Sequence, residues 1–125
     1  MNSKKPFFSV VIPTYNQSTY LKKSIESVMM QKFKDYEIIV IDNNSKDLTE
    51  KVTKSFKSKK IIYRKTSNEG NIAKSRNIGI KISKGKWIAL LDSDDFWYKN
   101  KLQSVYKIIK QKNEIDVICN DKMLY

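Results

Sequence analysis

The stretch Trp87-Ile88-Ala89-Leu90-Leu91-Asp92-Ser93-Asp94-Asp95 guides the interpretation of the whole chain, because a short apolar run ends abruptly in three carboxylates. An apolar run of about four to eight residues is typical of a strand buried on both faces of a sheet. Carboxylates cannot follow such a strand into the core, because burying an unpaired charge is too costly. The sequence therefore predicts a strand over residues 87–91, with the acids at the rim of the sheet.

The spacing of Asp92 and Asp94 around the small Ser93 supports two interpretations. In a turn, the two carboxylates can converge on one point, and hard cations such as Mg²⁺ or Mn²⁺ take oxygen ligands of this kind. The pair would then form a metal-assisted diphosphate site. The alternative is an acidic turn in which Asp94 or Asp95 caps the following helix.

Length and composition predict one folded domain. The 125 residues suit a single domain, and 40% hydrophobic residues in regularly spaced runs exclude a disordered chain. No apolar run reaches the length of a membrane span, and the run after Lys4 and Lys5 is too short for a signal peptide. With a single cysteine, Cys119, we expect a cytoplasmic protein. The absence of histidine argues against zinc sites and histidine-based acid–base chemistry.

The net charge of +12 predicts an affinity for anionic partners. Arg64 and Arg76 are the only arginines, and the lysines are spread along the whole chain. Because proteins that read bases usually rely on the arginine fork, we expect no nucleic-acid partner. Lysines also attract acidic lipid headgroups, so peripheral contact with the inner face of a membrane stays an alternative.

Apolar runs alternate with helical spacings along the chain and predict an α/β fold with a mainly parallel sheet. Strands are expected over residues 7–12, 36–41, 60–64, 87–91 and 115–119, the first of them ended by Pro13. A first helix is expected to follow a Ser18 cap, with the apolar stripe Leu21, Ile25, Val28 and Met29. A second is expected from an Asp47–Glu50 capping box to about Phe56. Two more are expected over residues 71–82 and around Leu102, Val105, Tyr106 and Ile109.

The carboxyl ends of parallel strands share one edge, where ligands of open α/β sheets bind. Pro13–Asn16, Asp42–Ser45 and Asp92–Asp95 should therefore gather at one rim. The side chains of Thr14, Tyr15 and Asn16 offer an aromatic face and hydrogen-bonding groups to a planar ring, or they merely shape a turn.

Two further side chains have alternative interpretations at this rim. Asp42 could accept a hydrogen bond from a base or a ribose hydroxyl, or it could bond to its own backbone. The fork of Arg76 could face a diphosphate, or it could form a surface salt bridge. The convergence of these residues on one edge favours a nucleotide–metal site.

Missing motifs exclude several other nucleotide-binding folds. The chain has neither the G-x-G-x-x-G of dinucleotide-binding folds nor the G-x-x-x-x-G-K-[ST] of P-loop proteins. A receiver-like domain would carry paired acids after its first strand, where this chain has Pro13–Asn16.

Four ordered blocks resemble family 2 glycosyltransferases and together span residues 10–95. The opening block is Val10–Asn16 with Tyr20-Leu21 and Ser27-Val28; the second is Glu37–Asp47, with Asn43-Asn44 where the family more often has Asp-Gly; the third comprises Asn68–Gly70, Ala73, Arg76-Asn77 and Gly79-Ile80; and the fourth is Leu90–Asp95, which resembles the D-x-D block. The four blocks in this order are far more specific than any one of them.

The resemblance implies a GT-A fold and inverting transfer of a sugar from a nucleotide diphosphate, with UDP the commonest carrier, to an acceptor. It implies that Pro13, Thr14, Tyr15 and Asp42 hold the base and ribose. It also implies that Asp94 binds Mn²⁺ or Mg²⁺ directly and that Asp92 lies near the ribose and the metal. The implied acceptor is a cell-surface polysaccharide or a lipid-linked glycan.

In such a family the catalytic base comes from a second half, after the D-x-D block. We therefore expect residues 1–125 to be a single donor-binding domain that lacks the acceptor-side half. Apolar surface left uncovered would favour a homo-oligomer. The alternative to an enzyme is a non-catalytic basic module that binds an anionic membrane surface or nucleic acid.

Overall fold

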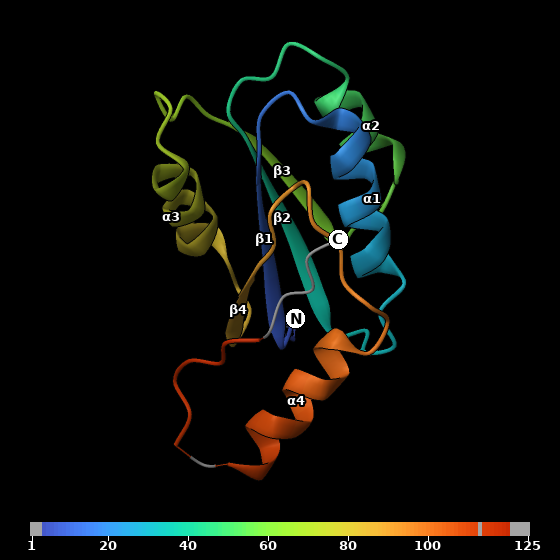
Figure 1. Ribbon diagram of the computed structural model, residues 1–125, viewed down its shortest axis with the longest axis vertical. Coiled ribbons are helices and arrows are strands. Elements are labelled where there is room, and N and C mark those ends of the chain that lie inside the picture. Colours follow the sequence, from blue (N-terminus) through green and yellow to red (C-terminus); the bar gives the residue numbers. More distant parts are fainter. Residues whose placement is uncertain (1–3, 113, 121–125) are drawn as a thin grey trace.

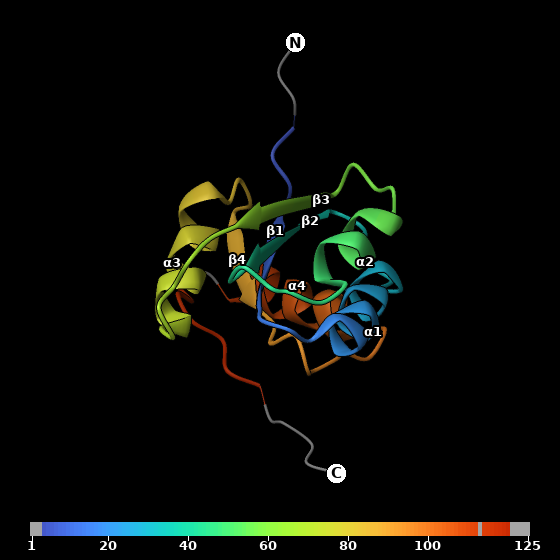
Figure 2. The same ribbon diagram turned by 90° about the horizontal axis from the view of Figure 1, so that it is seen from above.

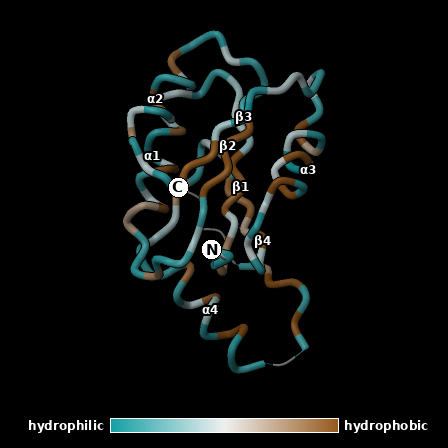
Figure 3. Tube along the Cα trace, turned by 180° about the vertical axis from the view of Figure 1, so that it is seen from behind, coloured by the Kyte–Doolittle hydropathy of each residue, from teal (hydrophilic) through white to brown (hydrophobic). Residues whose placement is uncertain are grey.

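The centre of the sheet consists of two strands whose side chains are all buried. In the computed structural model, which describes residues 4–112 and 114–120, β1 is Phe8–Thr14 and β2 is Tyr36–Asp42, with all seven positions of each buried. Continuous apolar runs of this kind need cover on both faces, which only a central position provides. Figure 3 shows the resulting hydrophobic band along β1 and β2.

The outer positions of the sheet belong to two shorter strands. β3 (Ile61–Lys65) pairs in parallel with β2, and β4 (Trp87–Leu90) pairs in parallel with β1. The strand order is therefore β3-β2-β1-β4. Both are partly exposed, as expected at the edges of a sheet. The predicted α/β fold with a parallel sheet is confirmed.

Helices cover both faces of the sheet (Figures 1 and 2). α1 (Ser18–Met29), α2 (Thr49–Ser55) and α4 (Lys101–Gln111) lie on one side and α3 (Ile72–Ile82) on the other. The larger core joins Val10, Ile12, Ile38 and Val40 to α1 and α4, whereas Val11, Ile39 and Ile41 pack against α3. None of the helices in residues 4–112 and 114–120 combines the length and apolarity needed to cross a bilayer.

β1 continues beyond the end of its neighbour β4. The last residue of β4, Leu90, lies opposite Val11, whereas β1 runs on to Thr14, opposite Asp42 of β2. The sheet therefore has a step at its carboxyl edge, on the β4 side of β1.

This step explains why the prediction that Pro13 ends the first strand is wrong. The backbone carbonyl of Val11 accepts a hydrogen bond from Leu91, after β4, while that of Thr14 accepts one from Asn43, after β2. Neighbouring residues of a strand bond alternately to the two sides, so Pro13 faces the β4 side beyond the point where β4 has ended. A proline, which has no N–H, costs no ladder hydrogen bond there.

Two predicted helix caps are also wrong. The residue before α1 is Gln17, and Ser18 is already helical, with its N–H donating to Asp47 Oδ2 at 3.0 Å. The residue before α2 is Leu48; Asp47 Oδ1 accepts from the N–H of Thr49 at 3.0 Å. Glu50 binds Lys54 and Lys65 instead of closing a capping box.

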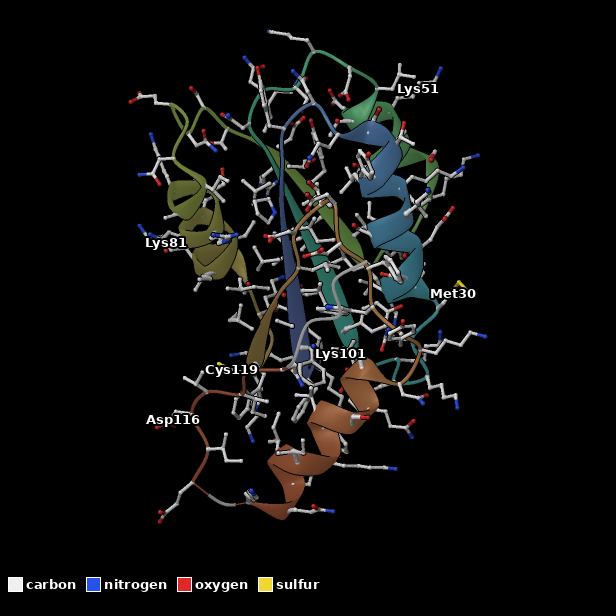
Figure 4. The ribbon with its side chains drawn as sticks, in the orientation of Figure 1. Met30, Lys51, Lys81, Lys101, Asp116 and Cys119 are labelled. Atoms are coloured by element: carbon white, nitrogen blue, oxygen red, sulfur yellow. The ribbon has the colours of Figure 1, made fainter. Side chains whose placement is uncertain are left out.

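The predicted strand over residues 115–119 is wrong, since these residues form no strand and pair with none. Their segment, with Asp116 and Cys119 labelled in Figure 4, runs as an irregular chain below β4. Ile118 packs against the larger core while Val117 is 76% exposed. One packed side chain satisfies the apolar pattern without hydrogen bonds to a neighbouring strand.

Candidate functional site

The loops after β1 and β2 are joined at the carboxyl edge of the sheet. The N–H of Asn43 donates to the carbonyl of Thr14 at 2.9 Å, and the N–H of Asn16 donates to the Ser45 hydroxyl at 2.9 Å. Asn16 Oδ1 in turn accepts from the N–H of Lys46 at 2.8 Å. Asn16 thus holds two of the three predicted rim segments together.

The loop after β4 is connected to the same rim by two side-chain contacts. The hydroxyl of Ser93 donates to Gln17 Oε1, directly before α1. Arg76, on α3, forms a 2.8 Å ion pair with Asp92 Oδ1. The salt bridge given above as the alternative role of Arg76 is therefore present, and it is made to one of the predicted site residues.

A cleft of about 340 Å³ opens where these segments meet. It is lined by Pro13, Thr14, Tyr15, Gln17, Asn68, Ile72, Arg76, Asp92, Ser93 and Asp94. Six of the residues predicted from the sequence are thereby brought together, whereas Asn16 and Asp42 do not line the cleft. The cleft occupies the step between the ends of β1 and β4.

Asp42 lies beneath the rim and is 1% exposed. Its Oδ1 accepts from the N–H of Ser45 at 3.0 Å and from the Ser45 hydroxyl at 2.5 Å, and its Oδ2 accepts from the Tyr63 hydroxyl at 2.5 Å. Burial, the hydrogen bond to Asp42 and the charges of Asp42 and Glu50 all raise the pKa of Tyr63. Asp42 has the backbone-bonded arrangement named above as its alternative, and it fixes the loop after β2.

The hydroxyl of Thr14 has no hydrogen-bond partner in the part of the chain that the structure describes. The residue is only 6% exposed, and it lines the cleft. A buried hydroxyl without a partner is costly, and most buried polar groups in proteins are satisfied. The Thr14 hydroxyl is therefore a polar group suited to a molecule that enters the cleft.

The acids after β4 form a compact cluster. Asp92, Asp94 and Asp95 each place one carboxylate oxygen within 4.8 Å of the others. They lie in a turn closed by the N–H of Asp95, which donates to the carbonyl of Asp92 at 3.0 Å. The following helix, α4, begins at Lys101, so capping does not explain these acids. A set of carboxylate oxygens fits Mg²⁺ or Mn²⁺.

A buried serine on α1 supports this turn from below. Ser24 is 0% exposed, and its hydroxyl lies 2.8 Å from the carbonyl oxygen of Ser93, beside the carbonyls of Asp92 and Asp95. Sequence reasoning missed Ser24. Its signal was a polar residue between Leu21 and Val28 on the apolar stripe of a helix, where a buried partner is expected.

Asn68 was also missed as a site residue, although it belongs to one of the blocks of the resemblance. It is 5% exposed, and its N–H donates to Asn43 Oδ1 at 2.7 Å. Its side chain accepts from the N–H of Gly70 at 2.8 Å and donates to the Ser75 hydroxyl at 2.9 Å. Asn68 therefore fixes the loop that leads into α3 and Arg76.

The family profile described as "Glycosyl transferase family 2" matches residues 9–121. The chain belongs to glycosyl transferase family 2. Among similar proteins is one from Rickettsia bellii, named "Uncharacterized glycosyltransferase", which is 44% identical over 108 residues. That match covers 86% of this chain and 16% of the relative, so this chain spans a small part of its length.

Solved glycosyltransferases share the fold of this family 2 chain. TarS 1–349 of S. aureus, in complex with UDP-GlcNAc, superposes with a TM-score of 0.79 and 30% identity, covering 83% of this chain and 31% of that one. The mannosyltransferase PcManGT from Pyrobaculum calidifontis, in complex with GDP-Man and Mn²⁺, gives a TM-score of 0.75 at 20% identity, over 86% of this chain and 33% of that one. The predicted GT-A fold is confirmed.

Proposed function

We propose that the cleft at the step of the sheet binds a nucleotide-diphosphate sugar together with Mn²⁺ or Mg²⁺, as the donor site of a glycosyltransferase. The observation that carries this proposal is the buried hydroxyl of Thr14, which has no partner within residues 4–112 and 114–120 and lies in a cleft that also contains Asp92 and Asp94. The similarity to TarS, which was solved with UDP-GlcNAc and with UDP, favours a UDP-sugar. Residues 1–125 would then be the donor-binding portion of the enzyme.

The residues of the cleft have separate roles in this proposal. Pro13, Thr14 and Tyr15 hold the base and ribose, with the Thr14 hydroxyl forming a hydrogen bond to the nucleotide. Asp94 and Asp92 hold the metal ion, which when bound neutralises the charge of the departing diphosphate. Arg76 keeps Asp92 in place through their 2.8 Å ion pair. Asp42 and Asn16 act indirectly, by fixing the loops that shape the cleft.

The transfer itself is proposed to be a single displacement with inversion. The bond between the anomeric carbon and the diphosphate oxygen breaks as the acceptor oxygen bonds to that carbon, and the acceptor proton passes to a general base. We assign this base to no residue of the chain. The acceptor, a cell-surface polysaccharide or a lipid-linked glycan, and a cytoplasmic location at the inner face of a membrane stay predictions from the resemblance.

Calorimetric titration of UDP with and without Mn²⁺ tests the donor site. We expect saturable binding that requires the metal and weakens by at least about tenfold in Asp94→Ala, which removes one of the two proposed carboxylate ligands. Asp116→Ala, in the exposed segment after α4, makes the same chemical change away from the cleft and should leave binding intact.

Two results would contradict the donor site. The first is UDP binding that is the same with and without metal and in Asp94→Ala. The second is the absence of binding by UDP and GDP alike. Binding to anionic surfaces that ignores metal and falls steeply with salt would then support the basic-module alternative.

A further inference from the structure

A second hollow lies at the end of the sheet opposite the donor cleft. It has a volume of about 660 Å³ and is formed where the chain enters β1 and β4 and where α4 packs below them. In Figure 1 this is the lower end of the sheet, next to α4. The proposed donor cleft is at the carboxyl ends of the strands, and no described residue lines both hollows.

Five lysines surround this hollow: Lys4, Lys5, Lys84, Lys86 and Lys110. All five are exposed, and Asp35 is the one carboxylate among the described residues that line the hollow. Lysines from three separate segments thus converge, which leaves a local excess of positive charge. Such a concave, positively charged surface concentrates anions.

The floor of the hollow is aromatic, but its rings already contact one another. Phe7 packs edge-to-face on Tyr106 with ring centroids 4.9 Å apart and on Phe33 at 5.9 Å. The ammonium of Lys110 lies 5.7 Å from the ring centroid of Phe7 and 5.5 Å from that of Tyr106. Single-stranded nucleic acids bind by stacking bases on open ring faces. This floor favours a ligand recognised through its charge.

We infer that this lysine hollow binds a ligand carrying two or more phosphate groups. Lysine ammonium groups bind phosphate as point charges. The number of lysines and the volume of about 660 Å³ exceed what a single phosphate needs. The ligand is either a soluble polyphosphorylated molecule or the headgroups of an anionic lipid surface. The inference does not depend on the donor site, since it involves neither the acids nor the metal.

Titration with inorganic tripolyphosphate in the presence of EDTA tests the lysine hollow apart from the donor site. We expect saturable binding that weakens by about tenfold or more in Lys84→Glu/Lys86→Glu, because both charges next to the ligand are reversed. The control Lys23→Glu/Lys51→Glu changes the net charge equally at exposed positions of α1 and α2 that do not line the hollow, and it should bind nearly as the parent does. Lys84→Gln/Lys86→Gln should give an intermediate loss, and far-UV circular dichroism should show the same fold in all four proteins.

Vesicles of phosphatidylglycerol identify the source of the phosphates. Vesicle binding that is lost in Lys84→Glu/Lys86→Glu supports the inference with a lipid as the ligand, whereas tripolyphosphate binding without vesicle binding supports it with a soluble ligand. Equal losses in the hollow pair and in the control pair would overturn it, since net charge alone would then explain the binding. So would the absence of saturable binding to tripolyphosphate and to the vesicles alike, or tighter binding of a single-stranded oligonucleotide at equal phosphate concentration.

Discussion

The Thr14 hydroxyl links stability and ligand binding at a single residue. Thr14→Val keeps the shape of the side chain and removes a buried hydroxyl that has no partner among the described residues. We expect the free energy of unfolding of the ligand-free protein to rise by about 1 kcal/mol, because an unsatisfied buried group is removed. UDP affinity in the presence of Mn²⁺ should fall by about five- to tenfold, which corresponds to one lost hydrogen bond. Urea denaturation and calorimetry measure the two effects.

Thr53→Val is the matched control for this change. Thr53 is equally buried, but its hydroxyl donates to the carbonyl of Thr49 at 2.8 Å, within α2 and away from the cleft. Its substitution should not raise stability and should leave UDP affinity unchanged. If Thr14→Val lowered both stability and affinity, the hydroxyl would have a structural role and the argument for a ligand contact would fail.

The hydrogen bond between Tyr63 and Asp42 predicts a dependence of stability on alkaline pH. Burial and the contact with Asp42 raise the pKa of Tyr63 above its ordinary value of 10.0. A group whose pKa is raised by folding contributes stability that is complete below the unfolded pKa and is lost as the pH rises above it. From about pH 9 to pH 11.5, the urea midpoint should therefore fall further in the parent than in Tyr63→Phe. Tyr36, whose pKa burial also raises, titrates in both proteins and cancels in the comparison.

At neutral pH, Tyr63→Phe should be less stable than the parent by about 1.5–3 kcal/mol, the value of a hydrogen bond to a charged group. Parallel falls of the two urea midpoints between neutral and alkaline pH would rule out the proposed contribution of Tyr63.

The candidate site could be predicted from the sequence only as far as strand order determines it. Thr14, Asp92 and Asp94 follow apolar runs, so a parallel sheet alone places them at one edge. The residues that support them depend on contacts across the chain, as in the bond of Ser24 to Ser93, 69 residues apart, and that of Gln17 to Ser93, 76 apart. Local patterns carry no information on such partners.

At the scale of elements, the position of α3 depends on a glycine. A Cβ added to Gly79 would lie 2.4 Å from Val11 Cγ1 on β1, so the helix can only lie this close to the sheet with glycine there. Gly79→Ala should lower the free energy of unfolding by about 1–3 kcal/mol, the usual cost of overpacking a core. It should also weaken UDP binding, because a shifted α3 carries Arg76 away from Asp92.

Urea denaturation and UDP titration of Gly79→Ala can be compared with Asn77→Ala, an exposed change to alanine on the same helix. We expect the control to be neutral or slightly stabilising. Equal stability of Gly79→Ala and the parent would mean that α3 can move without consequence and that its distance from the sheet does not matter.

The elements themselves were largely predictable, because long apolar runs and helical stripes report burial directly. β1 to β4 and α1 to α4 all lie where the sequence places them, within a few residues at their ends. The strand over 115–119 failed because an apolar pattern indicates burial but not a hydrogen-bonding partner. The extension of β1 past Pro13 was not predicted, because it depends on where β4 ends, about 80 residues away in the sequence. Only where β4 has ended does the proline cost no ladder hydrogen bond.

At the scale of the whole molecule, the outer edge of β4 determines the tendency to associate. Among the described residues, no strand pairs with this edge, and Leu90 on it is 52% exposed. Unpaired apolar edges are sites of edge-to-edge association. The homo-oligomer stays a prediction, and the outer edge of β4 is the surface through which we expect it to form. Leu90→Lys should reduce concentration-dependent association in analytical ultracentrifugation, whereas Ile108→Lys, exposed on α4, should not. A sedimentation coefficient that is independent of concentration in the parent would rule out association through β4.

The step between β1 and β4 has a consequence for how the donor cleft tolerates sequence change. β1 extends beyond the end of β4 by the three residues 12–14, a length of about 10 Å at the usual rise per residue of a strand. The recess exists because the backbone of β4 ends before that of β1. Substitutions of the side chains around the recess can therefore change which ligand it prefers without closing the recess. Substitutions should therefore change the ligand preference of this pocket readily, whereas one or two residues inserted into β4 should extend that strand into the recess and fill it.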